Sequence, residues 1–115
     1  MPGAQTDSPL PPATFFVLFA LASGDKHGYA ILKEARELSG NRFRMGPATL
    51  YTTVQRLTEY GWISPVPDAK SDDPRRRYYR LTPVGLQALQ NELHRMEALV
   101  TKSKAMPLRP AESAS

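Results

Sequence analysis

The feature that most constrains this chain is a run of ten residues, 13–22, in which every residue except Thr14 is apolar. A membrane-spanning helix needs about 20 apolar residues, so the run predicts no membrane span. No Lys or Arg precedes it, so it also lacks the positive segment of a signal peptide. A helix that is apolar on every side is buried on every side. We therefore predict, in a cytoplasmic protein, a buried helix that begins near Pro11 or Pro12 and ends at Gly24.

The core that can bury such a helix is small, because the chain has 115 residues and one domain commonly takes ~100–150. Residues 1–9 offer almost nothing to bury, and we predict a disordered arm there and a disordered tail over 106–115. The sequence contains no cysteine, which excludes disulfides, iron–sulfur clusters, thiolate zinc sites and a cysteine nucleophile. We expect neither a metal nor a cofactor.

Two further helices are predicted from apolar residues at helical spacing. The first covers residues 28–38, with Tyr29 and Leu38 among its apolar positions. The second begins with Gly46 as N-cap and Pro47 as the first helical residue. Its predicted buried stripe is Leu50, Val54 and Leu57, and its opposite face carries Thr49, Thr52, Thr53, Gln55, Arg56 and Glu59.

Short strands are predicted where polar and apolar residues alternate. Residues 42–45 indicate a very short strand. Residues 62–66 and 75–81 indicate the two strands of a hairpin, joined by the polar loop 67–74. Residues 24–26 are predicted to form a turn.

The last predicted helix begins at Thr82 and Pro83, another N-cap pair, and ends near Lys104. Its apolar residues are spaced 3, 4, 3 and 4, which is a heptad seam over two heptads. Such a seam packs either on its own domain or on a second subunit. We favour the subunit interface, because the domain is small and the first helix also needs cover on every side. The predicted interface residues are Phe15, Phe19, Leu86, Leu89, Leu93, Met96 and Val100.

Positive charge is concentrated in the middle of the chain. Fifteen Lys and Arg residues face eleven Asp and Glu residues, for a net charge of +4. Residues 42–80 hold eight of the basic residues and four of the acidic ones, so this segment accounts for the whole surplus. A polyanionic partner is therefore expected to contact this segment.

Three helices followed by a hairpin form a winged helix-turn-helix. The expected fold is mainly α with a small β-hairpin wing (α+β): a winged domain over 10–82 and a C-terminal dimerisation helix over 83–105. A helix-turn-helix places its second helix in the major groove, and arginines on a wing reach phosphates or the minor groove. The residues predicted to contact double-stranded DNA are Thr49, Tyr51, Thr52, Gln55 and Arg56 on the helix, and Arg75, Arg76 and Arg77 on the wing.

Four stretches of the sequence resemble the PadR-like transcriptional regulators in their order and spacing. They are His27-Gly28-Tyr29; Pro47-Ala48-Thr49-Leu50-Tyr51; Arg56-Leu57 followed by Gly61 and Ile63; and residues 75–83. The resemblance covers about residues 18–85 and the helix that follows. It implies a homodimeric DNA-binding repressor of a neighbouring gene, which often senses a small-molecule effector and dimerises through its last helix. A two-fold dimer is expected to bind a palindromic operator.

The sequence departs from the family pattern at three positions and at its C-terminal end. Ala48 stands where Gly is usual, Gly46 where Ser or Thr is frequent, and Trp62 where a smaller aliphatic residue is usual. Many members also have a longer C-terminal helical domain than the single helix predicted here. The sequence therefore does not predict a dedicated effector domain.

Several side chains have a structural interpretation beside a functional one. We expect His27 to cap or order its turn rather than contact a ligand, and Tyr29 to lie in the core with its hydroxyl at the surface. For Tyr51, packing and DNA contact stay equally open. Trp62 is expected in the core or an interface rather than as a ligand platform, and His94 on the surface.

Enzymatic activity is not expected, and no catalytic residue is assigned. The sequence has two histidines, no Gly-rich phosphate loop, and an acidic pair, Asp72-Asp73, that is predicted to lie on an exposed loop. The alternative function is a winged-helix module that binds proteins without binding DNA. RNA binding is a weaker alternative, because Tyr78 and Tyr79 point to opposite faces of one strand and form no stacking platform.

Overall fold

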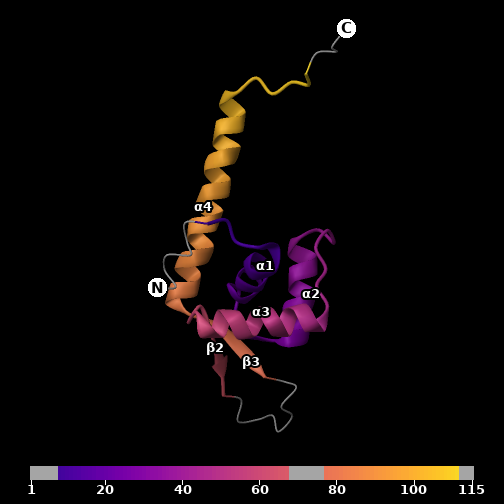
Figure 1. Cartoon of the computed structure of the whole chain (residues 1–115), viewed down its shortest axis with the longest axis vertical. Helices are drawn as coiled ribbons and strands as arrows, with labels where there is room; N and C mark the ends of the chain where they lie inside the picture. Colours follow the sequence, from indigo (N-terminus) through magenta and orange to yellow (C-terminus); the bar gives the residue numbers. More distant parts are fainter. Residues whose placement is uncertain (1–7, 68–76, 112–115) are drawn as a thin grey trace.

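The computed structural model describes residues 8–67 and 77–111. Within these residues the chain forms four helices and three short strands (Figure 1). The helices are α1 (Pro12–Leu21), α2 (Gly28–Leu38), α3 (Pro47–Glu59) and α4 (Pro83–Ala105). The strands are β1 (Lys26–His27), β2 (Ile63–Val66) and β3 (Tyr78–Leu81). None of these helices is long and apolar enough to cross a bilayer.

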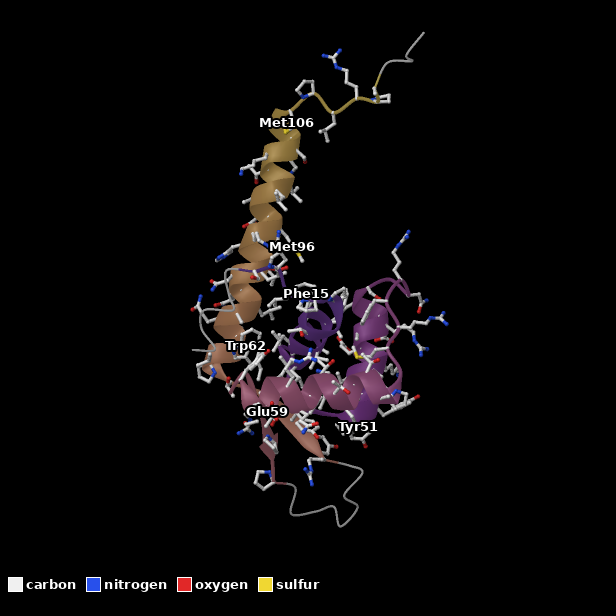
Figure 2. All side chains as sticks on the ribbon, in the orientation of Figure 1. Phe15, Tyr51, Glu59, Trp62, Met96 and Met106 are labelled. Carbon is white, nitrogen blue, oxygen red and sulfur yellow. The ribbon has the colours of Figure 1, made fainter. Side chains whose placement is uncertain are left out.

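Helix α1 lies at the centre of the core, as the apolar run predicts. Val17, Leu18 and Ala20 are completely buried, and α1 contacts α2, α3 and α4. The rings of Phe16 and Phe19 are only half-buried at the edge of the core. Trp62 completes the core at the place where α4 meets the rest of the domain (Figure 2).

The sheet contains the two strands of the predicted hairpin, β2 and β3, and a third strand, β1, that was not predicted. The strand order is β1-β3-β2, and both pairings are antiparallel. Lys26 and His27 form β1 opposite Tyr79 and Tyr78, so the prediction of a plain turn over 24–26 is wrong at Lys26. Two residues are too few to show an alternating pattern, so no sequence signal predicts this strand. The predicted start of β3 at Arg75 and the loop residues 68–74 lie outside the described residues.

The predicted strand over 42–45 is also wrong, because these residues form a loop between α2 and α3. The alternation has another cause. The ring of Phe43 stacks on Phe16 with centroids 5.3 Å apart, and Met45 packs against the core. The Oγ atom of Ser39 accepts a hydrogen bond from the Phe43 N–H at 2.9 Å and donates to the Phe43 carbonyl at 3.2 Å.

Helix α2 has the predicted bounds but a narrower buried face. Ile31 and Ala35 are buried. Tyr29 is 73% exposed and Leu38 is 37% exposed, so the prediction that Tyr29 lies in the core is wrong. Both residues are near an end of the helix, where α1 no longer covers the apolar face.

Helix α4 is fixed to the domain at its start by a close backbone contact. Thr82 caps the helix, since its Oγ1 accepts a hydrogen bond from the Gly85 N–H at 3.1 Å. The same hydroxyl donates to the Gly61 carbonyl at 2.6 Å, and the Thr82 N–H donates to the Trp62 carbonyl at 3.0 Å. These bonds tie α4 to the turn that follows α3.

Helix α4 packs on its own domain only as far as Met96. Ala88, Leu89 and Glu92 are buried there, whereas Leu99 and Val100 are about half exposed. Figure 1 shows the second half of α4 extending away from the other helices.

Candidate nucleic-acid interface

Helix α3 presents a polar face because its aliphatic stripe is turned inward. Leu50, Val54 and Leu57 are buried, as predicted. The helix begins at Gly46 and Pro47, where proline costs no backbone hydrogen bond. Thr53 was predicted on the exposed face, but it is only 3% exposed, so that assignment is wrong. Thr53 lies three residues after Leu50 and one before Val54, which places it at the rim of the buried stripe.

The polar face of α3 divides into two sides. Thr49, Thr52 and Arg56 are exposed and follow one another at spacings of three and four residues, so they form one row along the helix. Tyr51 and Gln55 are also exposed, but they lie on the side that faces the wing. Tyr51 is 64% exposed, which settles its packing alternative: this side chain does not belong to the core.

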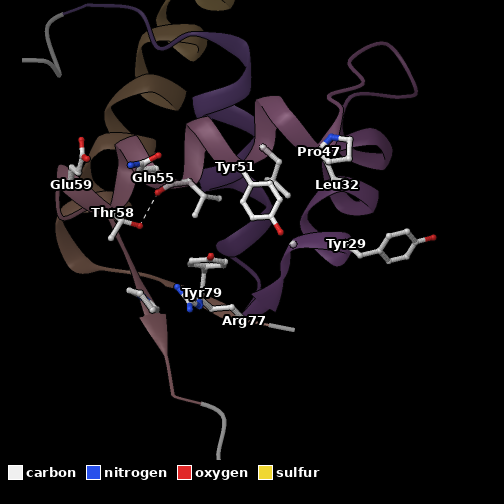
Figure 3. A pocket seen from close by; sticks show the side chains of 13 residues that line it. Tyr29, Leu32, Pro47, Tyr51, Gln55, Thr58, Glu59, Arg77 and Tyr79 are labelled. Carbon is white, nitrogen blue, oxygen red and sulfur yellow. Dashed lines mark hydrogen bonds between the residues drawn. The ribbon is translucent and has the colours of Figure 1, made fainter. Parts of the chain in front are cut away.

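A groove of about 690 Å³ separates α3 from β3, and we call it the wing groove. Tyr51 and Gln55 line it from α3, and Tyr79 and Arg77 line it from the wing (Figure 3). Glu59 lies at the opposite end of α3 from Tyr51 in the same view. The other lining residues are Gly28, Tyr29, Leu32, Pro47, Leu50, Val54, Thr58 and Pro65.

The phenol of Tyr79 is the titratable group in the wing groove whose ionisation is most affected by its surroundings. Partial burial raises the pKa of Tyr79 above its ordinary value, the charge of Arg77 lowers it, and Tyr51 raises it. A phenol with the ordinary pKa of 10.0 is already protonated at neutral pH, and the raised pKa favours the protonated form further, so the Tyr79 hydroxyl can donate a hydrogen bond.

His27 has a structural role at the start of α2, as expected. Its Nδ1 accepts a hydrogen bond from the Ala30 N–H at 3.3 Å, which makes it the N-cap. Its ring also meets the ring of Tyr78 edge-on, with centroids 5.4 Å apart. Because Nδ1 is engaged by the backbone, this nitrogen is not free for a ligand.

The arginines of the middle segment are in different situations. Arg80 forms an ion pair with Asp25 at 2.9 Å, which joins β3 to the turn before β1. Arg42 and Arg44 are exposed on the loop that leads into α3, and we did not assign them to the DNA site from sequence. The alternation of polar and apolar residues over 42–45 is the sequence signal that could have indicated their exposure. Arg77 lies at the wing groove, whereas Arg75 and Arg76 are outside the described residues.

The predicted subunit-interface residues are divided between core and surface. Leu89 and Phe15 are buried within the chain's own domain, and Phe19, Leu93 and Met96 are half-buried against it. Leu86 and Val100 are 40% and 52% exposed.

Trp62 and His94 lie where the sequence predicts them, in the core and on the surface. Trp62 is 1% exposed, as expected of a core residue, so it offers no ligand platform on the surface. His94 is exposed. Within residues 8–67 and 77–111, no three His, Asp or Glu side chains come together in a way that would hold a metal ion.

The fold and the exposed face of α3 beside a sheet define a winged helix-turn-helix protein. A family model described as the transcriptional regulator PadR-like family matches residues 17–91. A transcriptional regulator of Mycobacterium tuberculosis, Rv3488, is 36% identical over 84 residues, which are 72% of this chain and 74% of that protein. The chain therefore belongs to the PadR-like family.

A second relative is much longer than this chain. An uncharacterized 37.1 kDa protein in transposon TN4556 of Streptomyces fradiae is 38% identical over 87 residues. The matched part is 76% of this chain but only 24% of the relative. The chain thus spans about a quarter of that protein.

Solved structures share the fold. A PadR family regulator from Clostridium difficile aligns with a TM-score of 0.69 at 23% identity, over 83% of this chain and 97% of that one. Bacillus subtilis PadR in complex with operator DNA aligns with a TM-score of 0.64 at 20% identity, over 94% and 54%. Bordetella bronchiseptica BpsR, whose DNA binding is regulated by 6-hydroxynicotinic acid, aligns with a TM-score of 0.64 at 27% identity, over 92% and 73%.

Proposed function

We propose that this protein is a homodimeric transcriptional regulator that binds double-stranded DNA at a palindromic operator and represses a neighbouring gene. The main support for the proposal is the exposed row of Thr49, Thr52 and Arg56 on α3, whose opposite face packs in the core. A helix held in this way presents its polar side chains rigidly, as recognition of base edges requires. Such a protein acts where the chromosome is, so we propose that it is cytoplasmic.

Helix α3 is the recognition helix in this proposal. Thr49 and Thr52 are short, so the N-terminal half of α3 can come close to base edges in the major groove. Arg56 is longer and lies further along the helix, where it reaches a phosphate. Arg77, with Arg75 and Arg76 proposed beside it on the wing, adds charge at the flank.

Helix α4 is the dimerisation element in this proposal. Its second half carries exposed Leu99 and Val100 and extends past the domain that could cover them. Exposed apolar side chains on one helix are most simply covered by the same helix of a second copy, because the two-fold contact is self-complementary. Leu86 and the half-buried Leu93 and Met96 extend the same seam toward the domain.

In this proposal, the bound dimer accounts for repression and for its relief by an effector. A dimer seated on a promoter blocks access to it, which is repression. A small-molecule effector would relieve repression by binding a conformation that fits the operator poorly. The regulation of BpsR by 6-hydroxynicotinic acid supports an effector for this fold, although it does not name one for this chain.

Selection of bound sequences from random duplexes tests the proposed function. We expect a site with dyad symmetry whose half-sites lie about 10 bp, or a multiple of it, apart. The search should begin with the intergenic DNA beside the gene itself. A selected site without dyad symmetry would overturn the dimeric reading, and no enrichment over random duplex would overturn DNA recognition itself.

A further inference from the structure

The wing groove has two walls, one formed by α3 and the other by the wing. Side chains that can donate hydrogen bonds line both walls. Tyr51 belongs to α3, whereas Tyr79 and Arg77 come from the wing. Figure 3 shows the rings of Tyr51 and Tyr79 on opposite sides of this space, with Arg77 beside Tyr79. The hydroxyl groups of Tyr51 and Tyr79 have no hydrogen-bond partner among the described residues. Tyr51 is 64% exposed and Tyr79 is half-buried, so the described part of the fold encloses neither side chain completely.

The geometry of duplex DNA indicates which part of the DNA would occupy the wing groove. The major groove and the adjacent minor groove are separated by one sugar–phosphate backbone. If α3 lies in the major groove and the wing reaches the flanking minor groove, that backbone must pass between them. The space between α3 and β3 is the wing groove.

We propose that the wing groove holds one sugar–phosphate backbone of the operator, with the hydroxyls of Tyr51 and Tyr79 and the guanidinium of Arg77 as its phosphate ligands. The proposal rests on the proposed function and adds a site to it. Tyr79 becomes a DNA-contacting residue that sequence reasoning did not find, because only the fold places it opposite Tyr51.

The charges around the groove fix where the phosphate lies. Among the described residues that line the groove, Arg77 is the basic one and Glu59 is the acidic one. Glu59 lies toward the far end of α3, away from Tyr51 and Tyr79 (Figure 3). A phosphate is attracted to the end that carries Arg77 and repelled from the end that carries Glu59. The contacted phosphate is therefore expected at the end of the groove near Tyr51.

Neutral and charged phosphate ligands differ in a way that an experiment can separate. A tyrosine hydroxyl stabilises the complex but releases no counterion, so its loss weakens binding without changing the salt dependence. An arginine that neutralises a phosphate releases counterions, so its loss lowers both the affinity and the steepness of that dependence. Neither change alters the preference for one sequence over another, because phosphates carry no base information.

The first arm of the test measures the affinity of Tyr79→Phe, Tyr51→Phe and Arg77→Ala for selected operator and random duplex over a series of salt concentrations. We expect each Tyr→Phe variant to bind both duplexes about tenfold more weakly, since a dimer loses two hydroxyls, with the salt slope unchanged. Arg77→Ala should reduce the log–log salt slope by about 2 per dimer. Tyr60→Phe is the matched control, because Tyr60 packs against Trp62 and is not among the residues of the groove.

The second arm locates the phosphate. Single phosphates of the operator are replaced in turn by uncharged methylphosphonates, and each duplex is titrated with the wild-type protein and with Arg77→Ala. At one position in each half-site, between the major groove read by α3 and the flanking minor groove, the replacement should weaken wild-type binding clearly more than it weakens binding of Arg77→Ala, which keeps only the two tyrosine hydroxyls as ligands of that phosphate. Such non-additivity identifies a direct pair. Circular dichroism and thermal melting show that each variant is folded.

The possible outcomes separate the two proposals. If the wild-type protein prefers its operator but both Tyr→Phe variants bind like Tyr60→Phe, the wing groove does not hold the backbone and is open to a small molecule instead. If no methylphosphonate position couples to Arg77, the assigned phosphate contact is wrong. If the wild-type protein binds no duplex, the proposed function fails, and this inference fails with it.

Discussion

Gly85, in the first turn of α4, packs directly against the carbonyl group of Trp62 at the start of the wing. A Cβ atom placed on Gly85 would lie 2.0 Å from the Trp62 carbonyl oxygen. The same oxygen accepts the N–H of Thr82, so it cannot move away freely. This contact connects the proposed dimerisation helix to the turn that follows α3, and it sets the angle between them.

Gly85→Ala should therefore destabilise the protein, although replacing glycine by alanine inside a helix ordinarily stabilises it by roughly 0.5–1 kcal/mol. We expect the clash to exceed this gain and to lower the free energy of unfolding by about 1–3 kcal/mol. Urea denaturation followed by circular dichroism measures the change. Gln90→Ala, at an exposed position of the same helix, is the control and should change stability little. An increase in stability for Gly85→Ala would show that α4 does not approach Trp62 this closely.

Glu92 predicts a specific dependence of stability on pH. Its carboxylate accepts two hydrogen bonds from Arg95, at 2.7 and 3.0 Å, and one from the Leu10 N–H at 3.4 Å. The bonds from Arg95 are the main cause that lowers the pKa of Glu92 below its ordinary value of 4.5, the Leu10 N–H and the charge of Arg95 add to this, and burial opposes it. Because the pKa is lower in the folded state, this contribution to stability is present above pH 4.5 and is lost as the pH falls through the folded-state pKa.

The corresponding variant is Glu92→Gln. It should be less stable than the wild type at pH 7 by about 1–2 kcal/mol, because the charged hydrogen bonds are lost. The difference should shrink as the pH is lowered below about 4.5, since the wild-type carboxyl then becomes protonated. Urea midpoints over a pH series test this. If the urea midpoints of the wild type and of Glu92→Gln differ by the same amount at every pH down to 3, the ionised form of Glu92 does not stabilise the fold.

Val100 tests the proposed dimer, because it lies on the heptad seam and is 52% exposed within one chain. Val100→Asp should dissociate the dimer without unfolding the domain, since the charge is buried only in the dimer. Ala98→Asp introduces the same charge two residues away, at an exposed position off the seam, and should leave the dimer intact. Sedimentation at micromolar concentration separates one chain from two. Equal behaviour of the two variants would place the interface elsewhere.

Much of this fold follows from local signals that tertiary structure does not override. Proline at the first helical position fixes the starts of α3 and α4, at Pro47 and Pro83, and helical spacing identifies the buried stripe of α3. These signals depend on a few neighbouring residues, so they can be read from the sequence.

Other features depend on contacts between distant residues. The two-residue strand β1 exists because Lys26 and His27 meet the free edge of β3, and no local pattern marks it. Phe43 turns inward because Phe16 lies opposite, which imitates the alternation of a strand. The wing groove joins Tyr51 to Tyr79, and only the packing of α3 beside the sheet brings them together.

In the proposed complex, α3 reads DNA sequence through Thr49 and Thr52, whereas Arg56 holds a phosphate. Competition titration at fixed salt, with selected operator against random duplex, tests it most directly. Thr52→Ala should reduce the preference for the operator by about tenfold, which is the low end of ~1–3 kcal/mol for a specific contact, and should leave binding to random duplex nearly unchanged. Arg56→Ala should weaken binding to both duplexes alike. If Thr52→Ala lowers both affinities equally, or if Arg56→Ala alone abolishes the preference, α3 does not lie in the groove as proposed.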